Sequence, residues 1–228
     1  MNAPAAAQDF DVAIVGGGLV GASLALALAD TALRIALIEP VLPGEGSQPS
    51  FDDRCSALAN GSRRILESIG VWSGIARLAS PIRCIQISDA GRFGAARLSA
   101  EEQGLEALGY TVLNRQLGAA LWQRLHSQHS IVVLAPARVT AVNHQPDCVQ
   151  LQVTGADGVR LLHTRLAVAA DGAQLPGYSH VLHAGSGLLP RNSQHRKVAL
   201  IGSNSGVERY DQYARQYITQ RFGLHHND

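Results

Sequence analysis

Three glycines and one acid near the N-terminus have the types and spacing of a dinucleotide phosphate site. Gly16, Gly18 and Gly21 form a GxGxxG pattern between an apolar run and a small-residue run, and Glu39 ends the next apolar run about twenty residues later. Glycine lets the backbone approach a pyrophosphate closely, and the N–H groups of a helix N-terminus stabilise the phosphates. A carboxylate at position 39 can accept hydrogen bonds from ribose hydroxyls and repels a 2′-phosphate. The pattern therefore predicts an FAD-type or NAD-type site rather than an NADP site.

Two later motifs carry further groups toward the same place. Arg54 ends a loop rich in Pro, Gly and Ser that follows Glu39 directly, and long loops of this kind are often functional. Asp171 and Gly172 follow the apolar run 166–170. An acid at the end of a buried strand lies at the carboxyl edge of the sheet, where open α/β sheets bind their ligands.

The elements that must position these residues alternate in the manner of a Rossmann-like α/β domain. The glycine motif lies between a strand and a helix, and a second strand precedes Glu39. The segment around 82–98 has the pattern of a β-hairpin that leaves this domain, and a meander of short strands follows the last helix. The expected helices are 19–29, 60–70, 71–79 and 114–128, and the expected strands are 12–15, 35–38, 82–87, 95–98, 131–134, 139–142, 149–153, 159–162 and 166–170.

Composition excludes several other classes of function. A net charge of +1 with no basic tract argues against a nucleic-acid partner. The three cysteines form no CxxC pair and fit reduced thiols better than a disulfide framework or a zinc site. The histidines lack ligand spacing, so we predict no metal site. No run reaches the roughly twenty apolar residues of a membrane span, so we expect a soluble or peripheral protein.

The motifs together resemble a known family, the FAD-dependent aromatic hydroxylases, which are group A flavoprotein monooxygenases of the p-hydroxybenzoate hydroxylase type. The resemblance covers about residues 9–174. It is carried by GGGLVG with Glu39, by DDR ending at Arg54, and by RLAVAADGA with its Asp-Gly pair. Within the family, SFDDRCSALANGSRRILESIGVW and ISDAGRFGAARLSAEEQGLEALGY are similar to the hydroxylases of ubiquinone biosynthesis.

The resemblance implies a role for each of these residues. The three glycines would lie on the FAD pyrophosphate and Glu39 on its ribose. Arg54 would reach the cofactor near its phosphates and flavin. Asp171 and Gly172 match the motif associated with the pyrophosphate and with access of the nicotinamide cofactor. Asn114 stands where the family pattern RxxLxxxL has arginine or glutamine, so a shorter polar contact with FAD is expected there. The family needs no side-chain nucleophile, and we predict no catalytic residue.

The activity implied is hydroxylation of a phenolic substrate with O₂ and with NAD(P)H as electron donor. A prenylated phenol of the ubiquinone pathway would place a cytoplasmic protein at the periphery of the inner membrane or in a complex of that pathway. Two alternatives stay open. One is a non-catalytic remnant that at most binds FAD, and the other, disfavoured by the Asp-Gly motif, is a nicotinamide-only dehydrogenase.

The resemblance also implies a domain layout. A discontinuous FAD-binding domain would comprise 9–80 and 113–174, with a fragment of the substrate domain at 81–112. The family pattern fails at Leu175, where a serine is expected. We therefore expect residues 175–228 to be a divergent tail or, through a frameshift or an alternative terminus, sequence foreign to the family.

Overall fold

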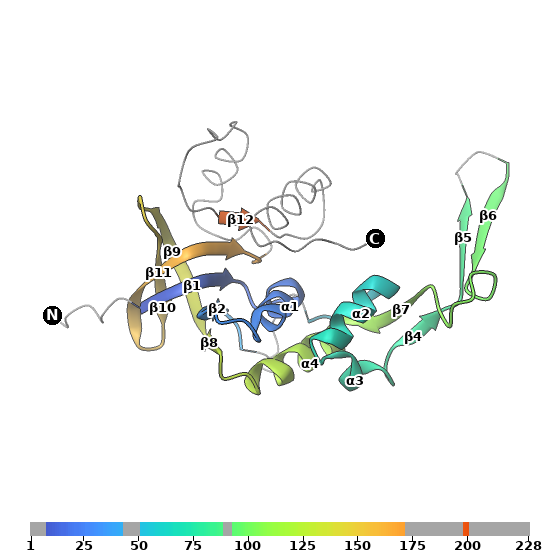
Figure 1. Cartoon of the computed structure of the whole chain (residues 1–228), viewed down its shortest axis with the longest axis horizontal. Coiled ribbons are helices and arrows are strands. Elements are labelled where there is room, and N and C mark those ends of the chain that lie inside the picture. Colours follow the sequence, from blue (N-terminus) through green and yellow to red (C-terminus); the bar gives the residue numbers. More distant parts are fainter. Residues whose placement is uncertain (1–7, 43–50, 89–92, 172–197, 201–228) are drawn as a thin grey trace.

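A computed structural model describes residues 8–42, 51–88, 93–171 and 198–200 of the chain. The main sheet has seven strands in the order β8-β2-β1-β11-β10-β9, with β12 paired to β11 (Figure 1). Strands β8, β2, β1 and β11 run parallel, whereas β9, β10 and β11 form an antiparallel meander. The strands are β1 (Gln8–Val15), β2 (Ile35–Ile38), β8 (Ile131–Leu134), β9 (Ala137–His144), β10 (Val149–Gly155), β11 (Gly158–Ala169) and β12 (Val198–Leu200).

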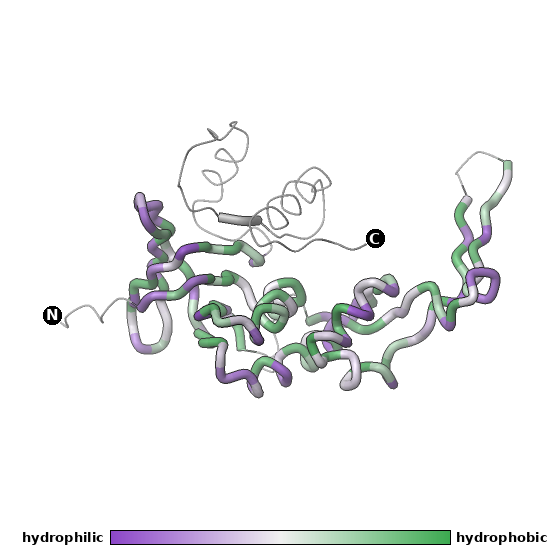
Figure 2. Tube along the Cα trace, in the orientation of Figure 1, coloured by the Kyte–Doolittle hydropathy of each residue, from purple (hydrophilic) through white to green (hydrophobic). Residues whose placement is uncertain are grey.

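The first strand–helix–strand unit lies at the centre of the core. Every residue of β2 is buried, as expected for a short apolar run with both faces covered. Along β1, Val12 and Ile14 pack with the helices, while Ala13 and Val15 pack with the meander, which follows the two-residue period of a strand. Figure 2 shows the hydrophobic residues concentrated along β2 and α1 (Leu19–Leu28). The apolar patterns of these segments therefore determine the layer in which each one lies.

Three further helices and a small sheet continue from this core. The helices are α2 (Asn60–Ser68), α3 (Trp72–Ile75) and α4 (Asn114–His126), and α4 packs along α1. The small sheet has the order β3-β7-β4, formed by Cys55–Ala59, Gly109–Leu113 and Ser80–Ile82. The hairpin of β5 (Cys84–Ser88) and β6 (Ala95–Ser99) extends away from the remaining elements (Figure 1). The predicted hairpin and the predicted first unit are thus confirmed.

Two expectations about strands were wrong. No strand was predicted at β3 or β7, yet these segments pair with each other and lead directly into α2 and α4. Separate strands were predicted at 159–162 and 166–170, but β11 is continuous across both. Polar residues interrupt its apolar run, but Arg165 is exposed and pairs with Asp11 on the neighbouring strand at 3.0 Å. A polar residue that faces solvent does not end a strand.

The predicted domain limits remain predictions, and the tail predicted from 175 onward lies outside the described residues apart from β12. Among the described helices, none has the length and apolar character needed to cross a membrane.

Candidate functional site

Two glycines at the junction of β1 and α1, Gly16 and Gly21, have no space for a Cβ atom. Gly16 has a φ of +103°, and its N–H donates to the carbonyl of Ile38 at 2.8 Å. A Cβ atom on Gly16 would lie 2.5 Å from the carbonyl oxygen of Ala170, and one on Gly21 would lie 1.9 Å from the carbonyl oxygen of Gly16. The absence of a side chain at Gly21 therefore lets α1 (Leu19–Leu28) pack closely on the end of β1, which is a role of the third glycine in this motif.

Gly18 lies at the N-terminal cap of α1. It is buried, has extended backbone angles, and its carbonyl accepts a hydrogen bond from Ala22 N–H at 3.0 Å. No side chain caps this helix, and its first turn contains no acidic residue. The first N–H groups of the helix and the positive end of its dipole therefore lie beside the glycine turn without a competing carboxylate from α1 itself.

Glu39 closes the turn from the end of β2. Its side chain is only 4% exposed, Oε2 accepts a hydrogen bond from Gly17 N–H at 2.5 Å, and Oε1 accepts one from Val41 N–H at 3.0 Å. Burial raises the pKa of Glu39 above its ordinary value of 4.5, although the two N–H groups and Arg138 favour the charged form. The negative charge of Asp171 also raises this pKa. The two acids at the carboxyl edge of the sheet therefore influence each other electrostatically.

Trp122 of α4 contacts the glycine turn, although its sequence position gave no sign of a role at the site. Its indole Nε1 donates to the carbonyl of Gly17 at 2.8 Å, and the side chain is 2% exposed. A Cβ atom on Gly17 would lie 2.8 Å from Cζ2 of this ring. The available signal is that a buried tryptophan needs a partner for its N–H. The sequence does not reveal that partner.

A second cluster forms where the DDR loop meets the first turn of α4. Arg54 pairs through Nε with Asp52 Oδ2, and its backbone N–H donates to Asp52 Oδ1 at 3.1 Å. Asn114 donates from Nδ2 to the same Oδ1 atom at 3.1 Å. Burial acts to raise the pKa of Asp52, but its hydrogen bonds with Arg54 and Asn114 outweigh this effect, and the pKa is lowered.

Two further contacts hold this loop on α4. Arg115 Nε lies 2.6 Å from Asp53 Oδ1. The ring of Phe51 lies against Gly118, where an added Cβ atom would come within 2.3 Å of the ring. Gly118 follows Asn114 by four residues and precedes Trp122 by four, so all three lie on one face of α4. That face contacts both the DDR loop and the glycine turn.

The structure thus gathers the predicted residues into two clusters. Gly16, Gly18, Gly21, Glu39 and Asp171 lie at the carboxyl edge of β1, β2 and β11. Arg54 and Asn114 lie together at the start of α4, and Asn114 N–H donates to the carbonyl of Arg54 at 2.9 Å. Eight residues of helix, about 12 Å at 1.5 Å per residue, separate Asn114 from Trp122. Gly172 lies outside the described residues.

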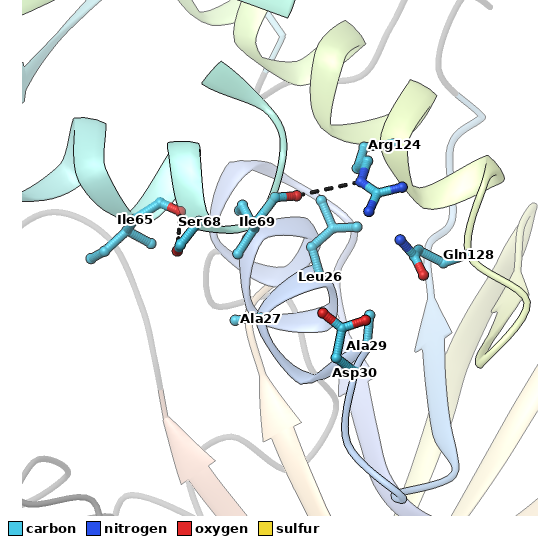
Figure 3. A pocket seen from close by; sticks show the side chains of 9 residues that line it. All are labelled: Leu26, Ala27, Ala29, Asp30, Ile65, Ser68, Ile69, Arg124 and Gln128. Carbon is cyan, nitrogen blue, oxygen red and sulfur yellow. Dashed lines mark hydrogen bonds between the residues drawn. The ribbon is translucent and has the colours of Figure 1, made fainter. Parts of the chain in front are cut away.

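A hollow of about 180 Å³ opens at the other end of α1 (Figure 3). It lies between the C-terminal ends of α1, α2 and α4, away from the glycine turn. Arg124 Nε donates to the carbonyl of Ile69 at 3.4 Å, so this cation caps the end of α2 (Figure 3). The hollow is therefore a gap between the ends of three packed helices, and the arginine that lines it is used to cap α2.

The described residues also bear on metal and thiol chemistry. Within them, no group of three or more His, Cys, Asp or Glu side chains is arranged to hold a metal ion. Cys55, Cys84 and Cys148 are free thiols.

Comparison with known proteins identifies an FAD-binding family and similar hydroxylases. Residues 9–179 match a family described as FAD binding domain. Ubiquinone hydroxylase UbiL of Rhodospirillum rubrum is 39% identical over 163 residues, which are 71% of this chain and 37% of that protein. The 3-demethoxyubiquinol 3-hydroxylase of Escherichia coli is 34% identical over 199 residues, which cover 86% of this chain and 45% of that protein. The chain thus spans less than half the length of either relative.

Solved structures support the fold. The p-nitrophenol 4-monooxygenase PnpA of Pseudomonas putida superposes with a TM-score of 0.60 at 19% identity, over 74% of this chain and 42% of that one. The anhydrotetracycline hydroxylase OxyS of Streptomyces rimosus gives a TM-score of 0.63 at 19% identity, over 76% of this chain and 34% of that one.

Proposed function

The chain belongs to the family described as FAD binding domain, and on that premise we propose that it binds FAD at the β1–α1 turn as the flavin-binding part of a phenol hydroxylase. The observation that carries this proposal is the turn itself. Added Cβ atoms on Gly16 and Gly21 would collide with backbone atoms, and the uncapped end of α1 lies next to a buried acid.

The residues present fit FAD. Gly16, Gly18 and Gly21 would face the pyrophosphate, which the N–H groups of α1 stabilise without a lysine. Glu39 has two oxygens that already accept hydrogen bonds, each with a further lone pair for a ribose hydroxyl. Arg54 would approach the phosphates or the flavin, and the pair Asp171 and Gly172 would act on the pyrophosphate, as the family motif implies. FAD supplies the redox and oxygen chemistry, and the chain binds it, orients it and excludes water.

The names of the relatives support a substrate class, and the electron donor is the one that the family resemblance implies. Both similar hydroxylases are named for ubiquinone or a ubiquinol, so a prenylated phenol of that pathway is the proposed substrate. The proposed co-substrates, O₂ and NAD(P)H, come from the family resemblance. The name of the Escherichia coli relative specifies position 3, whereas the sequence also resembles 2-octaprenyl-6-methoxyphenol hydroxylase. A prenylated substrate favours a place at the inner membrane surface or in a complex of the pathway.

The domain layout belongs to the same proposal. Residues 9–80 and 113–174 would form the FAD-binding domain, and 81–112, which includes the projecting β5–β6 hairpin, would be the start of the substrate domain.

Flavin content of the purified chain tests the proposal. We expect a yellow protein with one FAD per chain that oxidises NAD(P)H faster when a phenol is added. A yellow protein without this activity supports the flavin-binding remnant, and tight binding of NAD without flavin supports the dehydrogenase. A colourless protein that binds no added FAD refutes the proposal.

A variant of the turn locates the site. Gly18→Val should abolish FAD binding, because a branched side chain blocks the approach of the pyrophosphate. Gly61→Val is the matched control, since an added Cβ at Gly61 meets nothing within 4 Å. Retention of flavin by Gly18→Val would show that the glycine motif is misassigned.

A further inference from the structure

The amide of Asn114 is already engaged within the protein. The residue is 8% exposed, its Oδ1 accepts a hydrogen bond from Ser56 Oγ at 2.6 Å, and its Nδ2 donates to Asp52 Oδ1 at 3.1 Å. Both ends of the side chain thus point at polar groups of β3 and the DDR loop. This arrangement differs from the direct cofactor contact that the family pattern suggests for this position.

Asp52 links Asn114 to Arg54, because its carboxylate is bonded to both residues. The Oδ1 atom that accepts from Asn114 also accepts from Arg54 N–H at 3.1 Å, and Oδ2 pairs with Arg54 Nε. The Arg54 side chain is 72% exposed, and among the described residues its guanidinium pairs only with Asp52, through Nε. Its terminal amino groups therefore remain available to an anionic group of a ligand.

An exposed arginine binds a ligand more tightly when it is oriented beforehand. Its side chain carries about 2 kcal/mol of rotamer entropy, which is lost when the guanidinium is fixed on a ligand. A carboxylate held in place by a second hydrogen bond reduces that loss, because the arginine is oriented before the ligand arrives. A series of polar contacts connects the buried amide to the exposed cation in this way. It runs from Ser56 through Asn114 and Asp52 to Arg54.

We propose that Asn114 is a positioning residue that acts on the cofactor through Asp52 and Arg54 and makes no direct contact with it. This inference rests on the proposed function, in which Arg54 meets bound FAD. In this chain the shorter asparagine replaces arginine or glutamine. Instead of contacting the ligand itself, Asn114 orients Arg54, which does.

A double-mutant cycle on FAD affinity distinguishes the two roles. Asn114→Ala should raise the Kd for FAD about three- to tenfold when Arg54 is present, which corresponds to part of the entropy of one arginine. In the Arg54→Ala background the same change should alter the Kd by less than about twofold. Equal losses in the two backgrounds would show direct contact and overturn the proposal, as would an unchanged Kd for Asn114→Ala alone.

A control separates positioning from loss of stability. Leu125→Ala removes a core side chain that is 1% exposed at the far end of α4. It should lower the free energy of unfolding yet leave the Kd for FAD unchanged at temperatures where the variant is folded. If Leu125→Ala weakens FAD binding as much as Asn114→Ala does, the effect of Asn114 is merely structural and the proposal fails.

A measurement without FAD makes the result independent of the proposed function. In ¹⁵N NMR spectra of the flavin-free chain, the Arg54 Nε–H signal should exchange slowly with water, and Asn114→Ala should accelerate that exchange. An unchanged exchange rate would overturn the proposal. A wild-type chain that binds no FAD would refute the proposed function, while the NMR comparison still decides whether Asn114 orients Arg54.

Discussion

Replacing Gly21 by alanine tests the packing on which the whole site depends. The new Cβ atom would lie 1.9 Å from the carbonyl oxygen of Gly16, far inside van der Waals contact. That oxygen cannot retreat easily, because the N–H of Gly16 donates a hydrogen bond to Ile38 on β2 and Gly16 lies against Ala170, which directly follows β11. The helix must therefore move away from the sheet.

The magnitude follows from this geometry. Overpacking of a well-packed site costs about 1–3 kcal/mol, and a collision with pinned backbone belongs at the upper end. We therefore expect Gly21→Ala to lower the free energy of unfolding by about 3 kcal/mol. Gly61→Ala offers a matched control, because Gly61 lies in the first turn of α2 with nothing within 4 Å of an added Cβ. That change should raise stability by about 0.4–1 kcal/mol by restricting the unfolded chain.

Urea unfolding with linear extrapolation measures both variants against the wild-type chain. The free energy of unfolding should fall below that of wild type in Gly21→Ala and rise above it in Gly61→Ala. The two variants should therefore differ from each other by roughly 4 kcal/mol. The FAD affinity of Gly21→Ala should fall as well, because the phosphate turn moves with the helix. A Gly21→Ala variant within about 0.5 kcal/mol of wild type would refute the argument, since surface changes without structural consequence have effects of that size.

Three other predictions follow from the same contacts. Trp122→Phe keeps an aromatic ring but removes the donor to the Gly17 carbonyl, so the free energy of unfolding should fall by about 1–3 kcal/mol; urea unfolding that matches wild type would contradict this. Because burial raises the pKa of Glu39, its contribution to stability is greatest below pH 4.5 and is lost as the pH rises through the raised value. The stability of the wild-type chain minus that of Glu39→Gln should therefore fall with rising pH, and a rise would show that the sign is wrong. Gly118→Leu would fill the space of the Phe51 ring and displace the DDR loop, so titration should show a several-fold higher Kd for FAD, whereas an unchanged Kd would separate that loop from the cofactor.

The segments whose structure follows from local chemistry could be predicted from the sequence. The strand, glycine turn, helix and strand up to Glu39 have matching periodicity and turn residues over one short stretch, and the structure has all four. Even the need for glycine at position 21 follows from the motif. The helices that begin at Asn60 and Asn114 and the strand at 131–134 were recognisable for the same reason.

Strands that depend on distant partners could not be predicted in this way. β3 and β7 are separated by about fifty residues and carry mixed polar and apolar side chains, so their pairing has no local signature. The continuity of β11 likewise depends on its place in the sheet, because Arg165 faces solvent there and its side chain reaches Asp11 on β1.

The sequence by itself determined where the backbone had to be glycine and where an acid had to follow a strand, because backbone freedom and strand period are local properties. Only the tertiary structure decided which polar groups meet. Trp122 reaches the carbonyl of Gly17 across 105 residues, and Asn114 reaches Ser56 and Asp52 across 58 and 62. A buried polar group must find a partner, but folding of the whole chain selects which one. For that reason the hydrogen bond from Asn114 to the carboxylate that holds Arg54 could not be foreseen from the sequence.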